Sequence, residues 1–251
     1  MGKIVCWFSG GVTSTVATKL ALERYADVEI IFFETGSHHP DNERYFAECE
    51  KWFGQPIITL QHETHEDIYS VFEKERFLNS PYGAPCTKIL KRKVRQNWED
   101  KVDFRKNYDG QVFGFDCSPK EYTRAERFHK EYPYTNPLFP LIACNLTKED
   151  CIVLLQKNNI GIPKMYSLGY GNNNCIGCVK GGMGYWNKIR VDFPEVFEKT
   201  AALEREIGAT CITDRNGNRV YLDELDPKRG WALKPYVEPC GSFCDSLDGD
   251  E

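Results

Sequence analysis

The first fourteen residues constrain the fold of this chain most strongly. Lys3–Phe8 is a short apolar run typical of a buried strand, and it leads directly into the polar, glycine-bearing turn Ser9–Ser14. The next segment, Thr15–Tyr25, has the apolar spacing of a helix. A strand, a glycine-bearing turn and a helix in this order present backbone N–H groups to a phosphate. The N-terminus therefore predicts a protein that binds a nucleotide.

The turn itself has suitable chemistry for this purpose. Two adjacent glycines let the backbone approach an oxyanion closely, and hydroxyl groups on either side can donate hydrogen bonds to it. The pattern is neither the dinucleotide-binding nor the P-loop fingerprint, so both of those classes are disfavoured. The predicted phosphate loop consists of Ser9, Gly10, Gly11, Val12, Thr13 and Ser14.

The segments that follow predict a parallel sheet. Val28–Phe33 is typical of a buried strand, a helix follows at Asn42–Phe53, and Ile57–Leu60 and Gly110–Phe115 are predicted as the third and fourth strands. Alternating strands and helices imply parallel strands with right-handed crossovers. We therefore expect an α/β fold: a Rossmann-like parallel sheet with flanking helices.

Other elements are predicted from periodicity and capping. Thr147 is a suitable N-cap with Asp150 three residues later, and residues 161–184 are rich in Gly and Asn with little periodicity. Asn136–Ile142 is expected to be extended. Helices are predicted at Glu66–Leu78, Thr87–Trp98, Glu121–Lys130, Lys148–Asn158 and Phe193–Ile207.

Ligands of parallel sheets bind beyond the carboxyl ends of the strands. The turns after Phe8 and after Phe33 both follow strands, so we expect them to converge on one place. The second turn carries Glu34, Thr35 and Gly36, followed by His38 and His39. A histidine here can protonate a leaving group. A pair of surface histidines without a catalytic role is the alternative.

Composition limits the class of protein. The 251 residues are 41% hydrophobic and 27% charged, which is ordinary for a globular protein. No apolar run approaches the ~20 residues of a membrane helix, and no secretory signal is visible. We therefore expect a cytosolic protein without a membrane partner. A net charge of −5 argues against a general nucleic-acid coat, although Lys88–Arg95 forms a local basic patch.

Two pairs among the eleven cysteines have the spacing of metal ligands. Cys175 and Cys178 are separated by two residues, and Cys240 and Cys244 by three. Either spacing lets both sulfur atoms reach one ion, so a structural Zn²⁺ site built from these four is the simplest interpretation. A redox pair is the alternative from spacing alone. An odd number of cysteines excludes a complete disulfide framework.

Several short elements along residues 1–180 occur in a characteristic order. They are Ser9-Gly10-Gly11-x-x-Ser14, Glu34-Thr35-Gly36-x-x-x-Pro40, Pro85-Cys86-Thr87-Lys88-x-Leu90-Lys91, Gly114–Arg124, Pro140–Asp150, and Ile162 to Cys178. The first resembles the pyrophosphate loop (PP-loop) of the adenine-nucleotide α-hydrolase superfamily. The set resembles the phosphoadenosine phosphosulfate (PAPS) reductase-like branch, and Gly177–Cys244 looks like the C-terminal part of its phage-encoded members.

The resemblance implies the fold and the division of the chain. It implies a PP-loop domain over residues 1–170 and a small cysteine-rich, metal-binding C-terminal element over residues 171–251. It also implies a pocket for ATP or a related adenine nucleotide, completed by the Glu34–Pro40 turn and by Lys88, with Mg²⁺ on the phosphates. A nucleobase or tRNA is the implied acceptor, and a homodimer is compatible with this interpretation.

Two departures from the branch matter. PAPS reductases usually have a degraded loop, whereas this chain keeps both Gly10 and Gly11, as ATP-cleaving members do. Phe115 replaces the usual arginine of the fourth element, so Arg124 becomes the best remaining cation for an anion contact. A surface arginine on a helix is the alternative.

The resemblance leaves three functions open. The first is adenylation with pyrophosphate release, coupled to sulfur transfer, with His39 as an acid. The second is sulfonucleotide reduction with Cys240 as the thiol nucleophile. The third is a non-catalytic nucleotide-binding or interaction protein, suggested by Val12, Thr13 and Phe115. For the metal, the spacing of iron–sulfur relatives implies a [4Fe-4S] cluster on Cys86, Cys175 and Cys178 as the rival of zinc.

Overall fold

The structure is a computed structural model that describes residues 2–80, 83–214 and 216–230. Within these residues the chain forms two compact units, which we describe one at a time. The sheet unit comprises residues 2–33, 40–60 and 95–164, and the cysteine unit comprises residues 34–39, 61–94 and 165–230 apart from the gaps just given. The predicted division at residue 170 lies near the last boundary between the units, but the cysteine unit also takes two earlier segments.

A five-stranded sheet forms the centre of the sheet unit, with the strand order β3-β2-β1-β4-β5. Strand β1 pairs in parallel with β2 and with β4, and β4 pairs in parallel with β5. Val5 and Cys6 of β1 are fully buried, as expected for a strand covered on both faces. The predicted Rossmann-like α/β fold is confirmed. The strands are β1 Lys3–Trp7, β2 Val28–Glu34, β3 Ile58–Gln61, β4 Tyr108–Val112 and β5 Pro137–Leu138.

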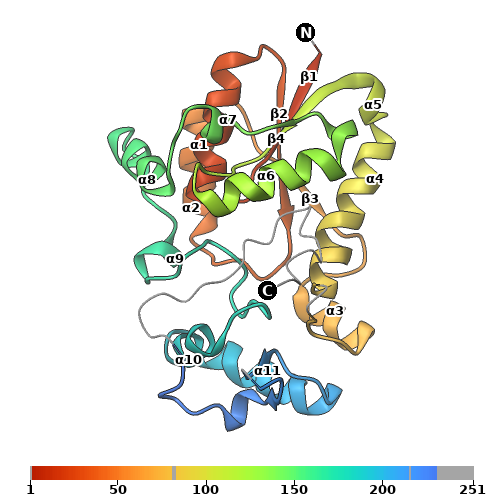
Figure 1. Cartoon of the computed structure of the whole chain (residues 1–251), viewed down its shortest axis with the longest axis vertical. Helices are drawn as coiled ribbons and strands as arrows, with labels where there is room; N and C mark the ends of the chain where they lie inside the picture. Colours follow the sequence, from red (N-terminus) through yellow and green to blue (C-terminus); the bar gives the residue numbers. More distant parts are fainter. Residues whose placement is uncertain (1, 81–82, 215, 231–251) are drawn as a thin grey trace. The chain divides into compact units, whose positions relative to one another are not determined.

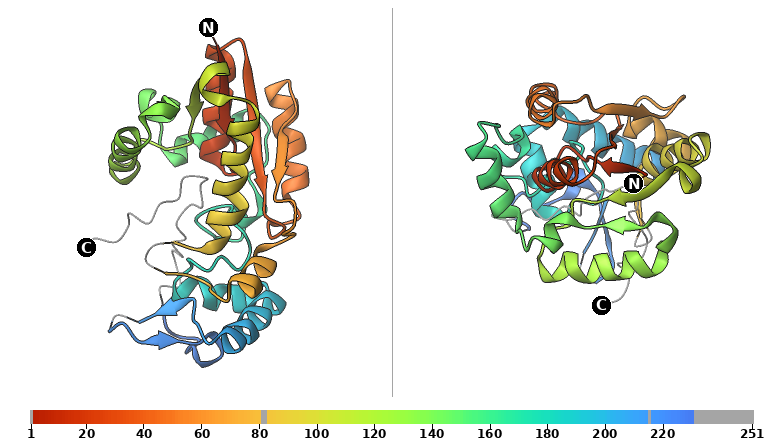
Figure 2. Two further views of the ribbon diagram at one scale, coloured as in Figure 1. Left: turned by 90° about the vertical axis from the view of Figure 1, so that its right-hand side faces the viewer. Right: turned by 90° about the horizontal axis from the view of Figure 1, so that it is seen from above.

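Helices flank this sheet (Figure 1). Helix α1 packs against β1 and against α2, α7 and α8. Helices α2 and α6 lie on opposite sides of the strands, as both views of Figure 2 show. The helices of this unit are α1 Val12–Arg24, α2 Asn42–Phe53, α4 Val94–Lys101, α5 Phe104–Asn107, α6 Pro119–Glu131, α7 Pro140–Ala143 and α8 Lys148–Lys157.

Capping explains where α8 begins. The backbone N–H of Asp150 donates to the Thr147 hydroxyl over 3.1 Å, and the backbone N–H of Thr147 donates to the Asp150 carboxylate over 2.9 Å. This reciprocal pair is a capping box and confirms the predicted N-cap. The prediction of an extended Asn136–Ile142 was partly wrong. Its second half forms the short helix α7, because Pro140 at the first helical position supplies the required φ.

The cysteine unit is mainly helical and carries one small antiparallel pair of strands. Helix α10 was not predicted, because the Gly- and Asn-rich region before it shows little periodicity. Trp186 and Ile189 of this helix are fully buried. Its elements are α3 Ile68–Glu75, a π-helix Thr87–Lys93, α9 Lys164–Ser167, α10 Met183–Asp192, α11 Pro194–Ile207, β6 Ile212–Thr213 and β7 Arg219–Val220.

One hydrophobic core holds the cysteine unit together. It gathers Phe72 and Leu78 with Trp186 and with side chains of α11. Cys175, Cys178 and Cys211 are buried in the same cluster, and Cys86 packs against it. The described cysteines of this unit therefore lie within or beside one apolar core. None of the helices in the described part of the chain is both long and apolar enough to cross a membrane.

Candidate functional site

The phosphate loop is a tight turn between β1 and α1. Gly10 has φ +74°, a left-handed conformation that a residue with a Cβ adopts only with strain. Gly11 is the N-cap of α1 and provides no side-chain cap, and the first turn of the helix contains no acidic residue. Among the described residues, α1 thus begins without a side-chain N-cap and without an acidic side chain in its first turn. This is the local arrangement that binds a phosphate at a helix N-terminus.

Hydroxyl groups hold this turn rather than extending from it. The backbone N–H and the hydroxyl of Ser9 both donate to the Ser14 hydroxyl, over 3.1 and 2.9 Å. Ser14 in turn donates to the carbonyl of Gly11 over 2.9 Å. Ser14 is buried and Ser9 is exposed. Ser14 thus fixes the loop, and the exposed Ser9 is more accessible to a ligand than the buried Ser14.

Gly114 brings the end of β4 against the loop. A Cβ at Gly114 would lie 2.6 Å from the backbone N and Cα of Ser14, closer than any side chain can approach. Only glycine lets the two backbones meet here. The element Gly114–Arg124 is one of those that resemble the family, but the contact of Gly114 with the first turn of α1 was not predicted from the sequence.

Arg124 lies on α6, with its guanidinium over an aromatic ring. Its Cζ is 4.4 Å from the ring centroid of Phe115, and its Nη1 is 3.3 Å from Oε2 of Glu121. The Arg124 side chain is 20% exposed. Val12 of the loop is buried and Thr13 is partly exposed. Arg124 is therefore a partly exposed cation of the sheet unit.

The remaining predicted nucleotide contacts belong to the cysteine unit. Glu34 Oε1 accepts the backbone N–H groups of Thr35 and Gly36, each over 2.7 Å. Gly36 has φ +64°, and a Cβ there would overlap the carbonyl oxygen of Glu66. Lys88 is exposed on the π-helix. The convergence of this turn with the phosphate loop remains a prediction.

A chain of polar contacts runs from the Glu34 turn to a buried thiol. His38 Nδ1 lies 3.1 Å from Glu34 Oε1, and His38 Nε2 lies 3.9 Å from the sulfur of Cys175. The Thr35 hydroxyl is 3.0 Å from the same sulfur. The neighbouring His39 instead packs its ring against Phe193, with centroids 6.0 Å apart. From the sequence, His39 was favoured as the acid. The carboxylate of Glu34, four residues before His38, is the feature that distinguishes the two histidines.

The pKa values of these three groups are shifted together. Burial opposes the charged form of each, but their mutual attraction outweighs it. Contact with His38 and the backbone N–H groups lowers the pKa of Glu34 to about 2. The Cys175 thiolate and Glu34 raise the pKa of His38 to about 9. His38, helped by Lys91 and Thr35, lowers the pKa of Cys175. The three shifts all act in favour of the charged forms, which are a carboxylate, an imidazolium and a thiolate in sequence.

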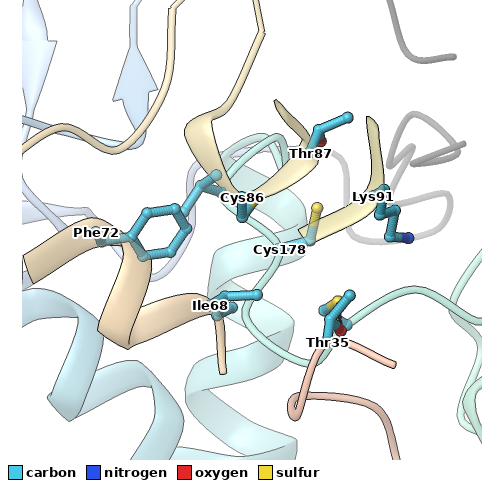
Figure 3. A pocket seen from close by; sticks show the side chains of 9 residues that line it. Thr35, Ile68, Phe72, Cys86, Thr87, Lys91 and Cys178 are labelled. Carbon is cyan, nitrogen blue, oxygen red and sulfur yellow. Dashed lines mark hydrogen bonds between the residues drawn. The ribbon is translucent and has the colours of Figure 1, made fainter. Parts of the chain in front are cut away.

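Cys175 lines a small cavity, and Figure 3 labels Cys86, Cys178 and Lys91 around it. Cys86 and Cys178 line the same cavity, together with Thr87 and Lys91 of the π-helix. Thr87 and Lys91 were not predicted as site residues. The sequence feature that could have indicated them is their spacing: Thr87 directly follows Cys86, and Lys91 comes four residues after Thr87. Short π-helical segments occur frequently at functional sites. Three of the five predicted metal ligands are therefore brought to one place.

The ligand set for a metal is incomplete in the described residues. Over residues 2–80, 83–214 and 216–230, no group of three or more His, Cys, Asp or Glu side chains is placed to hold a metal ion. Cys240 and Cys244 lie outside the described residues. The four-cysteine zinc site and the catalytic role of Cys240 thus remain predictions.

The contacts of His38 with Cys175 and Glu34 should make stability depend on pH. The raised pKa of His38 gives stabilisation that is complete below its ordinary value of 6.5 and is lost as the pH rises through about 9. We expect His38→Gln to lower the free energy of unfolding by about 2 kcal/mol below pH 6.5. The difference from the unsubstituted protein should shrink above pH 9, as measured by urea unfolding.

His39→Gln is the matched control for this measurement, because His39 has a similar position but a ring contact in place of the Glu34–Cys175 chain. We expect that variant to lose less stability below pH 6.5 than His38→Gln does. An equal loss of stability in His38→Gln on both sides of pH 9 would contradict the charge assignment.

Comparison with known proteins identifies the family of the chain. The family model of the phosphoadenosine phosphosulfate reductase domain matches residues 3–181. Two uncharacterized proteins of Methanocaldococcus jannaschii are similar: MJ0066, 26% identical over 215 residues, and MJ0973, 22% identical over 201 residues. The matches cover 79% and 80% of this chain, but only 41% and 47% of those proteins.

The chain thus spans less than half the length of either relative. Among solved structures, the phosphate complex of PAPS reductase from Candida auris is similar with a TM-score of 0.49 and 11% identity, over 70% of this chain and 82% of that one. Because the family model spans well over half of the residues, the chain belongs to the phosphoadenosine phosphosulfate reductase domain family.

Proposed function

We propose that this protein binds ATP or a related adenine nucleotide at Ser9–Ser14 and cleaves it at the α-phosphate, in a reaction coupled to sulfur transfer. The observation that carries the proposal is the intact glycine pair. Gly10 adopts the left-handed conformation that only glycine adopts easily, and Gly11 begins α1 without a side-chain cap. A degraded loop would lose the first property and offer fewer open N–H groups to a triphosphate.

The proposed reaction has two balanced steps. An acceptor oxygen attacks the α-phosphorus, the bond to the β-phosphate oxygen breaks, and pyrophosphate leaves with that electron pair. Sulfide, supplied as a co-substrate, then attacks the activated acceptor carbon, the bond between that carbon and the adenylate oxygen breaks, and AMP leaves with that electron pair. A nucleobase or a tRNA base is the proposed acceptor. The first N–H groups of α1 would hold the phosphates, and Arg124 would offset their charge.

Mg²⁺ bound to the phosphates would supply further charge neutralisation. The Glu34 turn and Lys88 are proposed to complete the nucleotide pocket, and His39 is proposed as an acid for the leaving group. The contacts of His38 with Glu34 and Cys175 support it as an additional proton carrier.

The sulfur step is assigned to the cysteine unit. Cys86, Cys175 and Cys178 line one cavity, and thiolates are the soft ligands that zinc and iron–sulfur clusters prefer. A [4Fe-4S] cluster holds its cysteines further apart than a single ion does. We propose that Cys86, Cys175 and Cys178 hold a [4Fe-4S] cluster, with zinc on the two cysteine pairs Cys175/Cys178 and Cys240/Cys244 as the alternative. Such a cluster would supply an iron that binds sulfur.

Sulfonucleotide reduction is the second candidate, and the family match supports it. That reaction needs a thiol that attacks the sulfur of PAPS, and Cys240 is the residue proposed for it. A nucleotide-binding protein without catalysis is the remaining alternative.

The products of labelled ATP distinguish these functions. With ATP, Mg²⁺ and bulk tRNA as acceptor we expect pyrophosphate rather than phosphate. We expect Gly10→Ala to weaken ATP binding about tenfold, because a Cβ at positive φ costs about 1–2 kcal/mol. Gly54→Ala is the control: Gly54 has φ +77° at the end of α2, and nothing lies within 4 Å of the added Cβ. It should lose similar stability and keep its ATP affinity.

Release of phosphate in place of pyrophosphate would contradict the proposed cleavage. Sulfite released from PAPS, and abolished in Cys240→Ser, would favour the reductase. ATP binding without any product would favour the non-catalytic alternative.

The metal assignment has its own test. We expect anaerobically purified protein to contain iron and to absorb visible light through thiolate–iron charge transfer, and Cys175→Ser to lose both. Cys144→Ser should retain them, because Cys144 is exposed on the sheet unit. A colourless protein loaded with zinc would contradict the cluster.

A further inference from the structure

The sheet unit places an aromatic ring, rather than a cation, directly after Gly114. Phe115 is only 9% exposed. Its ring stacks on Phe139 with centroids 5.2 Å apart and an angle of 19° between the planes, and it also meets Phe113 and Phe128 at 5.8 and 6.2 Å. Aromatic contacts on several sides fix the orientation of this ring.

The fixed ring carries Arg124. The guanidinium carbon of Arg124 is 4.4 Å from the centroid of Phe115, well within the range of a cation–π contact. Arg124 belongs to α6, so its guanidinium contacts the Phe115 ring from that helix. A planar guanidinium that stacks on a ring keeps its N–H edges free to bind an anion.

The ion pair of Arg124 is loose. Its Nη1 lies 3.3 and 3.4 Å from the two carboxylate oxygens of Glu121, whereas charge-assisted hydrogen bonds are usually about 2.7–2.9 Å long. The ring therefore contributes to placing the guanidinium, and Glu121 neutralises its charge only in part. A phosphate could compete with Glu121 for the guanidinium edges.

The backbone connects this stack to the phosphate loop. The Cβ position of Gly114 is 2.6 Å from the N and Cα of Ser14 and 3.0 Å from the carbonyl carbon of Thr13. Phe115 is the next residue. The ring that carries Arg124 is therefore anchored one residue from a direct backbone contact with the first turn of α1.

We propose that Phe115 is a positioning residue, whose ring holds the Arg124 guanidinium as the cation for the phosphates of a nucleotide bound at Ser9–Ser14. This inference rests on the proposed function, because it takes the bound anion to be a nucleotide phosphate. It explains how the site retains a cation although position 115 carries none. The charge comes from α6, and the aromatic side chain orients it.

A double-mutant cycle on ATP affinity tests the assignment. The dissociation constant of Mg–ATP is measured by isothermal titration calorimetry. We expect Arg124→Ala to weaken binding about tenfold and Phe115→Leu, which keeps apolar volume but removes the ring, to weaken it about fivefold. The double variant should bind no more weakly than Arg124→Ala alone, and Phe115→Tyr, which keeps the ring, should bind nearly as well as the unsubstituted protein.

Arg124→Lys gives a second reading that leaves the aromatic core intact. Lysine keeps the charge but lacks the planar group, so we expect a several-fold loss of affinity. Thermal unfolding of each variant separates loss of folding from loss of binding.

The outcomes that overturn the assignment are distinct. If the losses of ATP affinity multiply in the double variant, the positioning role is overturned while ATP binding stands. The same holds if Arg124→Ala loses affinity and neither Phe115→Leu nor Arg124→Lys does. Failure of the unsubstituted protein to bind ATP would overturn the proposed function, and this assignment with it.

Discussion

The turn between β1 and α1 is the constraint on which the sheet unit depends. Strand β1 is buried between two parallel partners, so the chain leaving it has little freedom. Gly10 reverses direction at positive φ, and the Ser14 hydroxyl holds the turn closed against the Gly11 carbonyl. Gly114 then packs its backbone against the same turn. The features that pack this turn also leave α1 without a side-chain N-cap among the described residues, so folding and the proposed phosphate binding rely on the same geometry.

The cysteine unit depends on a different physical balance. Burying Glu34, His38 and Cys175 in their charged forms is costly, and the cost is offset only because each charge faces an opposite one. Glu34 also accepts two backbone N–H groups, which anchors the chain of contacts to the turn. The result is a polarised thiol at the wall of a cavity that two further cysteines line. Removing His38 takes away the positive charge between Glu34 and Cys175, so we expect the three groups to act as a unit.

Much of the sheet unit could be predicted from the sequence, because its signals are local. Apolar runs followed by glycine turns marked the strands, and the Thr147 cap marked α8. Helix α10 was missed because glycines before it obscure its periodicity. The pairing of Glu34, His38 and Cys175 could not be predicted either, since it joins residues about 140 positions apart. The sequence could not show that the Ser14 hydroxyl binds the loop backbone instead of a ligand. The directions of its hydrogen bonds show this.

The central claim is that the first turn of α1 binds the phosphates of an adenine nucleotide. Amide hydrogen exchange, followed with and without saturating Mg–ATP, tests it most directly, because the claim concerns backbone N–H groups. The account predicts that ATP slows exchange at the amides of residues 10–15, with a smaller effect in Gly10→Ala. Unchanged exchange across these residues, while ATP is bound elsewhere on the chain, would contradict it.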